Sequence, residues 1–161
     1  MPSNRTALII GASRGIGLGL VRQLHGAGWQ VTATVRDPAR ASELRAMNGV
    51  QIESLDIDDA AALDTLVQRL QGQVFDLLFV NAGIIGPGHQ SAARATIEEL
   101  GQLFMTNVTA PIRLAERLVD QLRPQTGVLA FMSSGLGSVA NPEGNNPVSY
   151  THLRAHETRE D

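Results

Sequence analysis

The chain has 161 residues, which is enough for one domain with a sizeable hydrophobic core, and its 43% apolar and 18% charged residues are typical of a globular protein. Its net charge of −3 gives no electrostatic reason to expect nucleic acid or an anionic membrane as a partner, and the lack of cysteine excludes disulfide and thiolate chemistry. No apolar run approaches the roughly 18 residues of a membrane span, and no signal segment follows Met1, so we expect a soluble, cytoplasmic protein.

Short apolar strands alternate with helices along the chain. Near-continuous apolar strands are typical of parallel sheets that are buried on both faces. We predict strands at residues 6–10, 29–35, 50–55, 75–80 and 126–133. We predict helices at residues 14–26, 39–47, 60–70 and 96–122, with Asp37, Asp58 and Thr96 as caps. Five alternations predict an α/β fold, a doubly wound parallel sheet with helices on both faces.

A glycine-rich turn joins the first strand to the first helix: Gly11-Ala12-Ser13-Arg14-Gly15-Ile16-Gly17. Gly11 permits a tight exit from the strand, Gly15 lets the backbone approach a pyrophosphate, and Gly17 lets the helix pack closely on the strand. The N-terminus of the helix adds unpaired N–H groups and the positive end of its dipole. The turn therefore predicts a nucleotide-phosphate site, although similar turns also occur for purely structural reasons.

Polar or glycine residues follow every predicted strand. The carboxyl ends of parallel strands meet at one edge of a sheet, where ligands of doubly wound folds bind. These residues therefore indicate a site at that edge: Gly11, Arg36, Asp56-Ile57, Asn81-Ala82-Gly83 and Ser133-Ser134.

Together with Asn107-Val108-Thr109-Ala110-Pro111, these motifs occur in the order and spacing of the short-chain dehydrogenase/reductase superfamily. The sequence resembles in particular its single-domain, sniffer- or C-factor-like carbonyl reductase branch, over residues 6 to about 140. The resemblance implies a Rossmann-type fold that here lacks its last strands and helices. It also implies an NAD(P)-dependent oxidoreductase that acts on a small-molecule carbonyl or alcohol substrate, and a full-length parent that forms homo-oligomers.

The resemblance also implies roles in cofactor binding. Asp56 would accept a hydrogen bond from the adenine amino group, Ile57 would pack on the ring, and residues 81–83 would line the wall beneath the ribose and nicotinamide. Alternatively, Asp56 caps the following helix and residues 81–83 form a plain turn. The implied cofactor site contains Gly11, Ser13, Arg14, Gly15, Ile16, Gly17, Arg36, Asp56, Ile57, Asn81, Ala82 and Gly83.

The charges near the second strand favour NADP(H) over NAD(H). An acidic residue at the end of this strand would bind the ribose hydroxyls and repel a 2′-phosphate, but here Arg36 follows the strand and Arg14 can reach the same side. Two guanidiniums suit bidentate pairing with a phosphate. Asp37 opposes this interpretation, because it could turn into the site or pair with Arg36. We expect no metal site.

For catalysis, the resemblance implies a Ser–Tyr–Lys set and a supporting Asn. Ser134 would polarise the carbonyl, Tyr150 would pass the proton, and the backbone of Asn107 would hold a water that continues the relay. The lysine position is occupied by Arg154, which is bulkier and cannot share its protons with a relay water, so it cannot readily replace the lysine. The alternative is a nucleotide-binding sensor or scaffold that kept the dinucleotide site without catalysis.

The end of the chain has a second unusual feature. Residues 148–158 resemble the in-frame translation of a transposase-type sequencing adapter. We therefore expect an NAD(P)-binding domain at residues 1–146 and a non-native tail at residues 147–161, in which Tyr150 is in register by coincidence. Without the missing elements, the fifth strand and the long helix should expose apolar surface. We therefore expect the chain to be prone to aggregate and inactive.

Overall fold

The computed structural model describes residues 5–91 and 93–134, which belong to two compact units. Of the described residues, 5–82 and 111–132 form the first unit, and 83–91, 93–110 and 133–134 belong to the second. The sheet lies entirely within the first unit.

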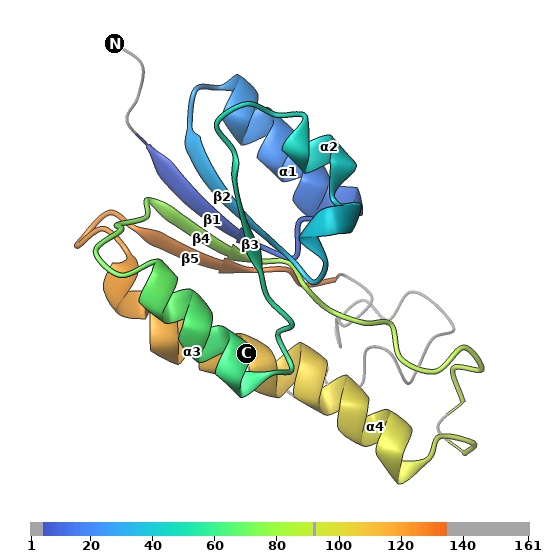
Figure 1. Cartoon of the computed structure of the whole chain (residues 1–161). Coiled ribbons are helices and arrows are strands. Elements are labelled where there is room, and N and C mark those ends of the chain that lie inside the picture. The colour runs from blue at the N-terminus through green and yellow to red at the C-terminus, as the bar shows by residue number, and fades with distance from the viewer. Residues whose placement is uncertain (1–4, 92, 135–161) are drawn as a thin grey trace, which may run out of the picture. The chain divides into compact units, whose positions relative to one another are not determined.

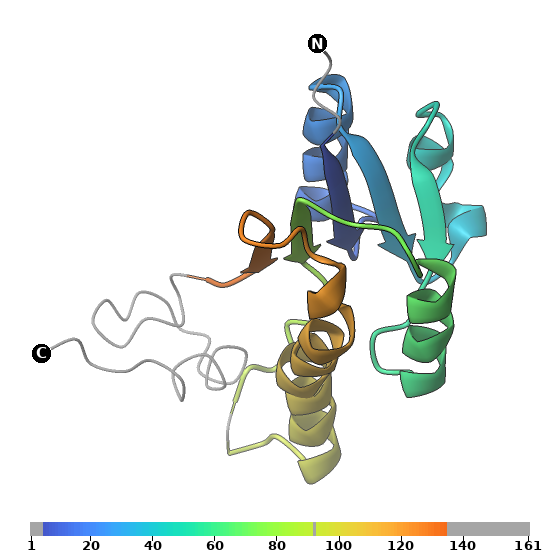
Figure 2. The same cartoon turned by 90° about the vertical axis from the view of Figure 1, so that its left-hand side faces the viewer.

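Five parallel strands form the sheet, in the order β3-β2-β1-β4-β5. Figure 2 shows them side by side in this order. The chain adds β2 and β3 on one side of β1 and then crosses to the other side for β4 and β5, which makes the sheet doubly wound, as predicted. The strands are β1 (Thr6–Ile10), β2 (Gln30–Val35), β3 (Gln51–Ser54), β4 (Leu77–Val80) and β5 (Val128–Phe131).

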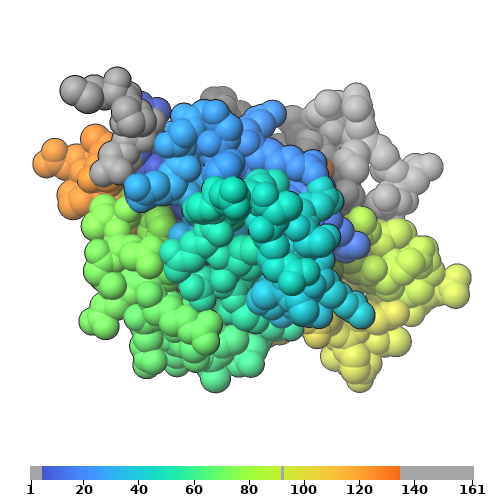
Figure 3. All heavy atoms as spheres, turned by 45° about the horizontal axis from the view of Figure 1, so that its top comes forward, coloured from blue at the N-terminus to red at the C-terminus, as the bar shows by residue number. Residues whose placement is uncertain are grey.

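Helices cover both faces of the sheet (Figure 1). On one face, α1 (Gly15–Gly26) and α2 (Ser42–Arg45) bury apolar side chains against β1 and β2. Figure 3 shows the blue segment that contains α1 next to the teal segment that contains α2. Arg22 of α1 forms an ion pair with Glu43 of α2. On the other face, α3 (Ala60–Arg69) and the C-terminal part of α5 (Ala110–Leu118) pack against β1 and β4. The predicted two-sided arrangement is confirmed.

The predicted helix at residues 39–47 is wrong. The structure has a 3₁₀ turn, η1 (Pro38–Arg40), followed by the single turn of α2. Ala41 lies between them with non-helical backbone angles and is buried in the core, so tertiary packing overrides the local helix preference of this alanine-rich segment. The predicted cap is correct, because the Asp37 side chain accepts a hydrogen bond from the Ala39 N–H at 3.0 Å.

The cap of α3 is Asp59 rather than the predicted Asp58. The Asp59 carboxylate accepts hydrogen bonds from the N–H groups of Ala61 and Ala62, at 2.8 and 3.2 Å. Because Asp59 directly precedes the helix, its side chain reaches the second and third residues of the first turn, as an N-terminal cap does.

The predicted long helix at residues 96–122 is interrupted. The capping box of Thr96 and Glu99 opens α4 (Ile97–Phe104) as predicted, but a π-helical segment, η2 (Met105–Thr109), separates α4 from α5, and a 3₁₀ turn, η3 (Val119–Gln121), follows. Pro111 has no N–H to complete the α-helical bond to the carbonyl of residue 107, which explains why the regular pattern fails here.

The predicted exposure of apolar surface is confirmed. At the edge strand β5, Val128 is 52% and Phe131 is 47% exposed, and exposed apolar side chains also occur along the helical segments, at Ile97, Phe104, Ile112 and Val119. Within residues 5–91 and 93–134, the structure contains no helix with the length and apolar character that crossing a membrane requires.

The ion pair between Asp76 and Arg123 links segments at the amino ends of the strands. Asp76, which directly precedes β4, accepts hydrogen bonds from the Thr6 N–H at 2.8 Å and from Arg123 Nε at 2.5 Å. The hydrogen bond from Arg123 is the main reason why the pKa of Asp76 is lowered from 3.8 to about 2. This carboxylate therefore connects β1, β4 and the segment before β5.

We expect Asp76→Asn to lower the free energy of unfolding at pH 7 by about 1 to 2 kcal/mol, because the charged hydrogen bonds are lost. Since the pKa in the folded state is below 3.8, the carboxylate stabilises the fold above that pH and this contribution disappears as the pH falls toward 2. Urea unfolding can be followed through the fluorescence of Trp29, the sole tryptophan.

Asp64→Asn is the matched control, since its pair with Arg117 is formed by two half-exposed side chains and should contribute little. A stability difference between Asp76→Asn and the unmodified chain that stays constant from pH 7 to pH 2 would contradict this role of the ion pair.

Candidate functional site

The five strands end at the same edge of the sheet, which we call the carboxyl edge. Ile10 of β1 pairs in register with Thr34 of β2 and with Val80 of β4, and Val80 pairs with Phe131 of β5. The residues that follow the strands therefore line one edge, as predicted. Within the first unit these include Gly11, Arg36, Asp56 and Asn81.

Gly11 leaves β1 in a conformation that only glycine adopts easily. Its φ is +85°, and a Cβ atom at this position would lie 2.7 to 2.8 Å from atoms of Ala82. The Gly11 N–H donates to Thr34 Oγ1 at 3.1 Å, and Asn81 Nδ2 donates to the Gly11 carbonyl at 2.9 Å. Both polar groups of Gly11 are thus held by the neighbouring chain segments.

Gly17 is tightly packed against its neighbours, whereas Gly15 has free space around it. A Cβ atom at Gly17 would lie 2.3 Å from the Gly11 carbonyl oxygen and 2.8 Å from Asn81 Nδ2, so α1 can approach the strand this closely only with glycine here. Gly15 has a φ of +58°, and a Cβ atom there would meet nothing within 4 Å. The predicted tight exit at Gly11 and close packing at Gly17 are confirmed, and Gly15 faces open space.

Among the described residues, no side chain caps the start of α1. Arg14 precedes the helix without a side-chain capping hydrogen bond, and the first turn contains no acidic residue. Ser13 is exposed and Ile16 is 64% exposed. The first N–H groups of the helix and the positive end of its dipole therefore favour an anion at this place.

The side chain of Asp37 is engaged away from Arg36. Its carboxylate accepts the Ala39 N–H and pairs with Arg40 at 3.5 Å. Among the described residues, the exposed guanidiniums of Arg14 and Arg36 have neither an ion-pair nor a hydrogen-bond partner. The structure thus contains two cationic side chains that can bind an anion, one after β1 and one after β2.

Asp56 and Ile57 follow β3. Asp56 is exposed, and its Oδ1 accepts the N–H of Asp58 at 3.1 Å, while the helix cap is Asp59. The alternative role of Asp56 as a helix cap is therefore wrong. Ile57 is partly buried against the core that contains α3.

In the second unit, the side chain of Asn107 is paired with backbone. Asn107 Oδ1 accepts the Ile84 N–H at 2.9 Å, and Asn107 Nδ2 donates to the Ile84 carbonyl at 2.8 Å. A Cβ atom at Gly83 would lie 3.1 Å from Asn107 Oδ1, so a larger residue here would require the Asn107 amide to shift slightly. Because both polar atoms of the Asn107 side chain bind the Ile84 backbone, any further role of this residue would have to involve its backbone.

The remaining predicted residues are less fully described. Ser134 lies three residues beyond β5 and is half-buried. Tyr150 and Arg154 lie outside the described residues.

The sequence interpretation missed one residue that shapes the carboxyl edge. Thr34 lies in the strand predicted at residues 29–35 and is not among the predicted site residues, yet its hydroxyl and its carbonyl both accept hydrogen bonds from the glycine turn. The available signal was a threonine one position before the end of a buried strand, where a hydroxyl needs a hydrogen-bond partner.

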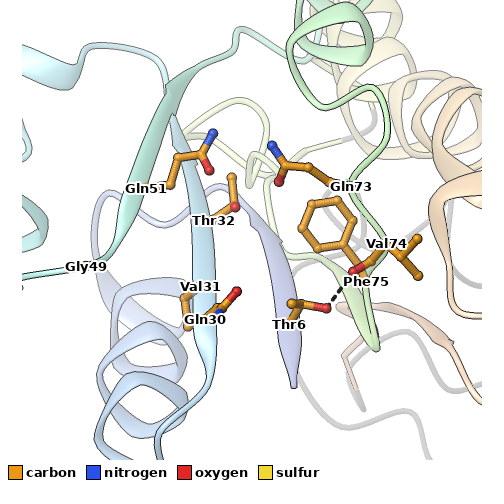
Figure 4. Close-up of a pocket in the computed structure, with 9 residues that line it drawn as sticks. All are labelled: Thr6, Gln30, Val31, Thr32, Gly49, Gln51, Gln73, Val74 and Phe75. Atoms are coloured by element: carbon orange, nitrogen blue, oxygen red, sulfur yellow. Dashed lines mark hydrogen bonds between the residues drawn. The ribbon is translucent and has the colours of Figure 1, made fainter. Parts of the chain in front are cut away.

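A separate cavity of about 440 Å³, which we call the amino-edge cavity, lies near the opposite ends of the strands (Figure 4). Neutral side chains and one glycine line it: Thr6, Gln30, Val31, Thr32, Gly49, Gln51, Gln73, Val74 and Phe75. It contains none of the residues predicted to bind a cofactor.

The comparison with protein families decides the classification. A family model described as short chain dehydrogenase matches residues 5–147. The chain belongs to the short-chain dehydrogenase family.

Solved short-chain dehydrogenases and reductases have the same fold. A carbonyl reductase from Pseudomonas aeruginosa PAO1 in complex with NADP is 35% identical, with a TM-score of 0.85 over 95% of this chain and 68% of that chain. A putative family member from Burkholderia multivorans with bound NADP is 34% identical, with a TM-score of 0.85 over 94% and 68%. The putative carbonyl reductase Sniffer of Caenorhabditis elegans is 27% identical, with a TM-score of 0.80 over 95% and 74%.

Curated relatives are longer than this chain. The short chain dehydrogenase gsfK from Penicillium aethiopicum is 30% identical over 158 residues, which cover 89% of this chain and 62% of the relative. The short-chain dehydrogenase cctT from Talaromyces islandicus is 28% identical over 84% of this chain and 48% of the relative. The chain therefore spans about half to three-fifths of the length of these relatives.

We expect Gly17→Ala to destabilise the chain by about 3 kcal/mol, because the new methyl group would overlap the Gly11 carbonyl and force α1 away from the strand. Gly19→Ala is the control in the same helix. A Cβ atom at Gly19 meets nothing within 4 Å, so alanine should stabilise the helix by about 0.5 to 1 kcal/mol.

Urea unfolding of both variants measures the two effects. Equal stability of Gly17→Ala and Gly19→Ala would show that the close contact between α1 and β1 is not needed.

Proposed function

We propose that this chain binds NADP(H) at the carboxyl edge and represents part of an oxidoreductase that transfers a hydride between nicotinamide and a small carbonyl or alcohol substrate. The observation that carries the proposal is the combination of an open glycine turn with the guanidiniums of Arg14 and Arg36, which have no ion-pair partner within residues 5–91 and 93–134. NADP in two of the related structures supports it.

The residues of the carboxyl edge suit the parts of this cofactor. The open backbone at Gly15 and the uncapped N-terminus of α1 fit a pyrophosphate. Arg14 and Arg36 would hold the 2′-phosphate, since Asp37 is occupied by Arg40. Asp56 would accept a hydrogen bond from the adenine amino group through Oδ2, the carboxylate oxygen that does not bind the Asp58 N–H.

The chemistry is proposed for residues further along the chain. When bound, NADPH supplies a hydride. Ser134 would polarise the substrate carbonyl, Tyr150 would donate the proton, and Asn107 would orient a relay water through its backbone, because its amide is paired with Ile84. Arg154 stands where the resemblance implies lysine, so we propose that the chain as printed binds the cofactor without turning over substrate.

One observation favours a second function. A dinucleotide site without the lysine also suits a nucleotide-binding sensor or scaffold. The parental reading frame beyond Asn146 separates the two proposals. A Tyr-x-x-x-Lys motif there supports the enzyme, and its absence supports the binding protein. Cytoplasmic location and homo-oligomerisation of the parent stay predictions.

We expect Arg36→Ala to lower the preference for NADPH over NADH by about tenfold, because a charge-assisted contact to the 2′-phosphate is lost. Isothermal titration calorimetry with each cofactor measures this ratio. Arg22→Ala is the matched control, since Arg22 is a half-exposed arginine of α1 that pairs with Glu43 of α2 and has no part in the proposed site. An unchanged affinity ratio in Arg36→Ala would contradict the assignment of Arg36 to the 2′-phosphate.

A further inference from the structure

Thr34 places a buried hydroxyl next to the glycine turn. Its neighbours in β2, Ala33 and Val35, face the core beneath α1, so Thr34 points to the opposite face of the sheet. The side chain is only 1% exposed. A hydroxyl in such a place is costly unless it forms a hydrogen bond, and valine has nearly the same shape.

Two hydrogen bonds of Thr34 involve the exit from β1. Thr34 Oγ1 accepts the Gly11 N–H at 3.1 Å, and the Thr34 carbonyl accepts the N–H of Ala12 at 2.9 Å. Thr34 therefore binds two successive N–H groups at the point where the backbone turns into its left-handed conformation. Register explains this position, because Thr34 pairs with Ile10, the last residue of β1.

Gly11 is held from the other side as well. Asn81, which follows β4, donates its amide to the Gly11 carbonyl at 2.9 Å. Since β2 and β4 are the two neighbours of β1 in the sheet, Gly11 is hydrogen-bonded to residues from both sides. These hydrogen bonds fix the peptide groups of Gly11 and thereby the direction of the backbone toward Gly15.

We propose that Thr34 is a positioning residue for the pyrophosphate of the cofactor: its hydroxyl orients the glycine turn so that the backbone at Gly15 and Ile16 can receive the phosphates. This inference rests on the proposed NADP(H) site. Replacing Thr34 by valine would keep the volume but leave the Gly11 N–H without its acceptor, so the turn would lose its orientation.

Thr32 provides a matched control in the same strand. It points to the same face as Thr34, is 5% exposed, and lines the amino-edge cavity (Figure 4). Within the described part of the chain, its hydroxyl makes no hydrogen bond to the glycine turn. Thr32→Val thus removes an equally buried hydroxyl from β2 without touching the proposed site.

The test compares two probes. The first is 2′-phospho-ADP-ribose, which contains the pyrophosphate and the 2′-phosphate of NADP but no nicotinamide. The second is adenosine 2′-monophosphate, which lacks the pyrophosphate. Calorimetric titration with both probes is carried out on the unmodified chain, Thr34→Val, Thr34→Ser and Thr32→Val. We expect Thr34→Val to bind the first probe about tenfold more weakly and the second probe unchanged.

Thr34→Ser should retain the affinity of the unmodified chain because it keeps the hydroxyl, and Thr32→Val should also retain it. Equal affinity of Thr34→Val and the unmodified chain for 2′-phospho-ADP-ribose would overturn the positioning role. A parallel loss of affinity for both probes would also overturn it, because that result reports general damage to the fold. An unmodified chain that binds neither probe would overturn the proposed function, and this inference with it.

Discussion

The close contact between the glycine turn and the end of β4 is the constraint on which the carboxyl edge depends. Gly17 brings the start of α1 against the Gly11 carbonyl, and Asn81 donates its amide to the same oxygen. Side chains at Gly11 or Gly17 would collide with Ala82 or with the Gly11 carbonyl itself. This contact sets the orientation of the first turn of α1, and the proposed phosphate site follows from that orientation.

Much of the fold could be predicted because the strands are short and continuously apolar. Each predicted strand overlaps an observed one, and β1 agrees at both ends. The doubly wound order followed from the alternation of strands and helices. Two predictions failed where tertiary context decides: buried Ala41 breaks the predicted helix after β2, and the helical register at Asn107 changes before Pro111.

The candidate site was less accessible to sequence reasoning. Glycine positions could be interpreted because their spacing has a direct steric meaning, but hydrogen bonds between distant segments leave no local pattern. The bond from Gly11 to Thr34 joins residues 23 positions apart, and the pairing of Asn107 with Ile84 spans the same separation. The sequence likewise left open whether Asp37 turns into the site or pairs with Arg36. In the structure its carboxylate binds the Ala39 N–H and Arg40 instead.

Backbone NMR of the ¹⁵N-labelled chain during titration with NADPH tests the central claim most directly, because it locates the ligand on the sheet. A phosphate site at the carboxyl edge predicts chemical-shift changes at the amides of Gly11, Gly15, Ile16 and Arg36, with the amides around the amino-edge cavity unchanged. Saturable changes confined to Gln30, Gln51 and Gln73, or no changes at Gly15 and Ile16, would contradict a cofactor site built on the glycine turn.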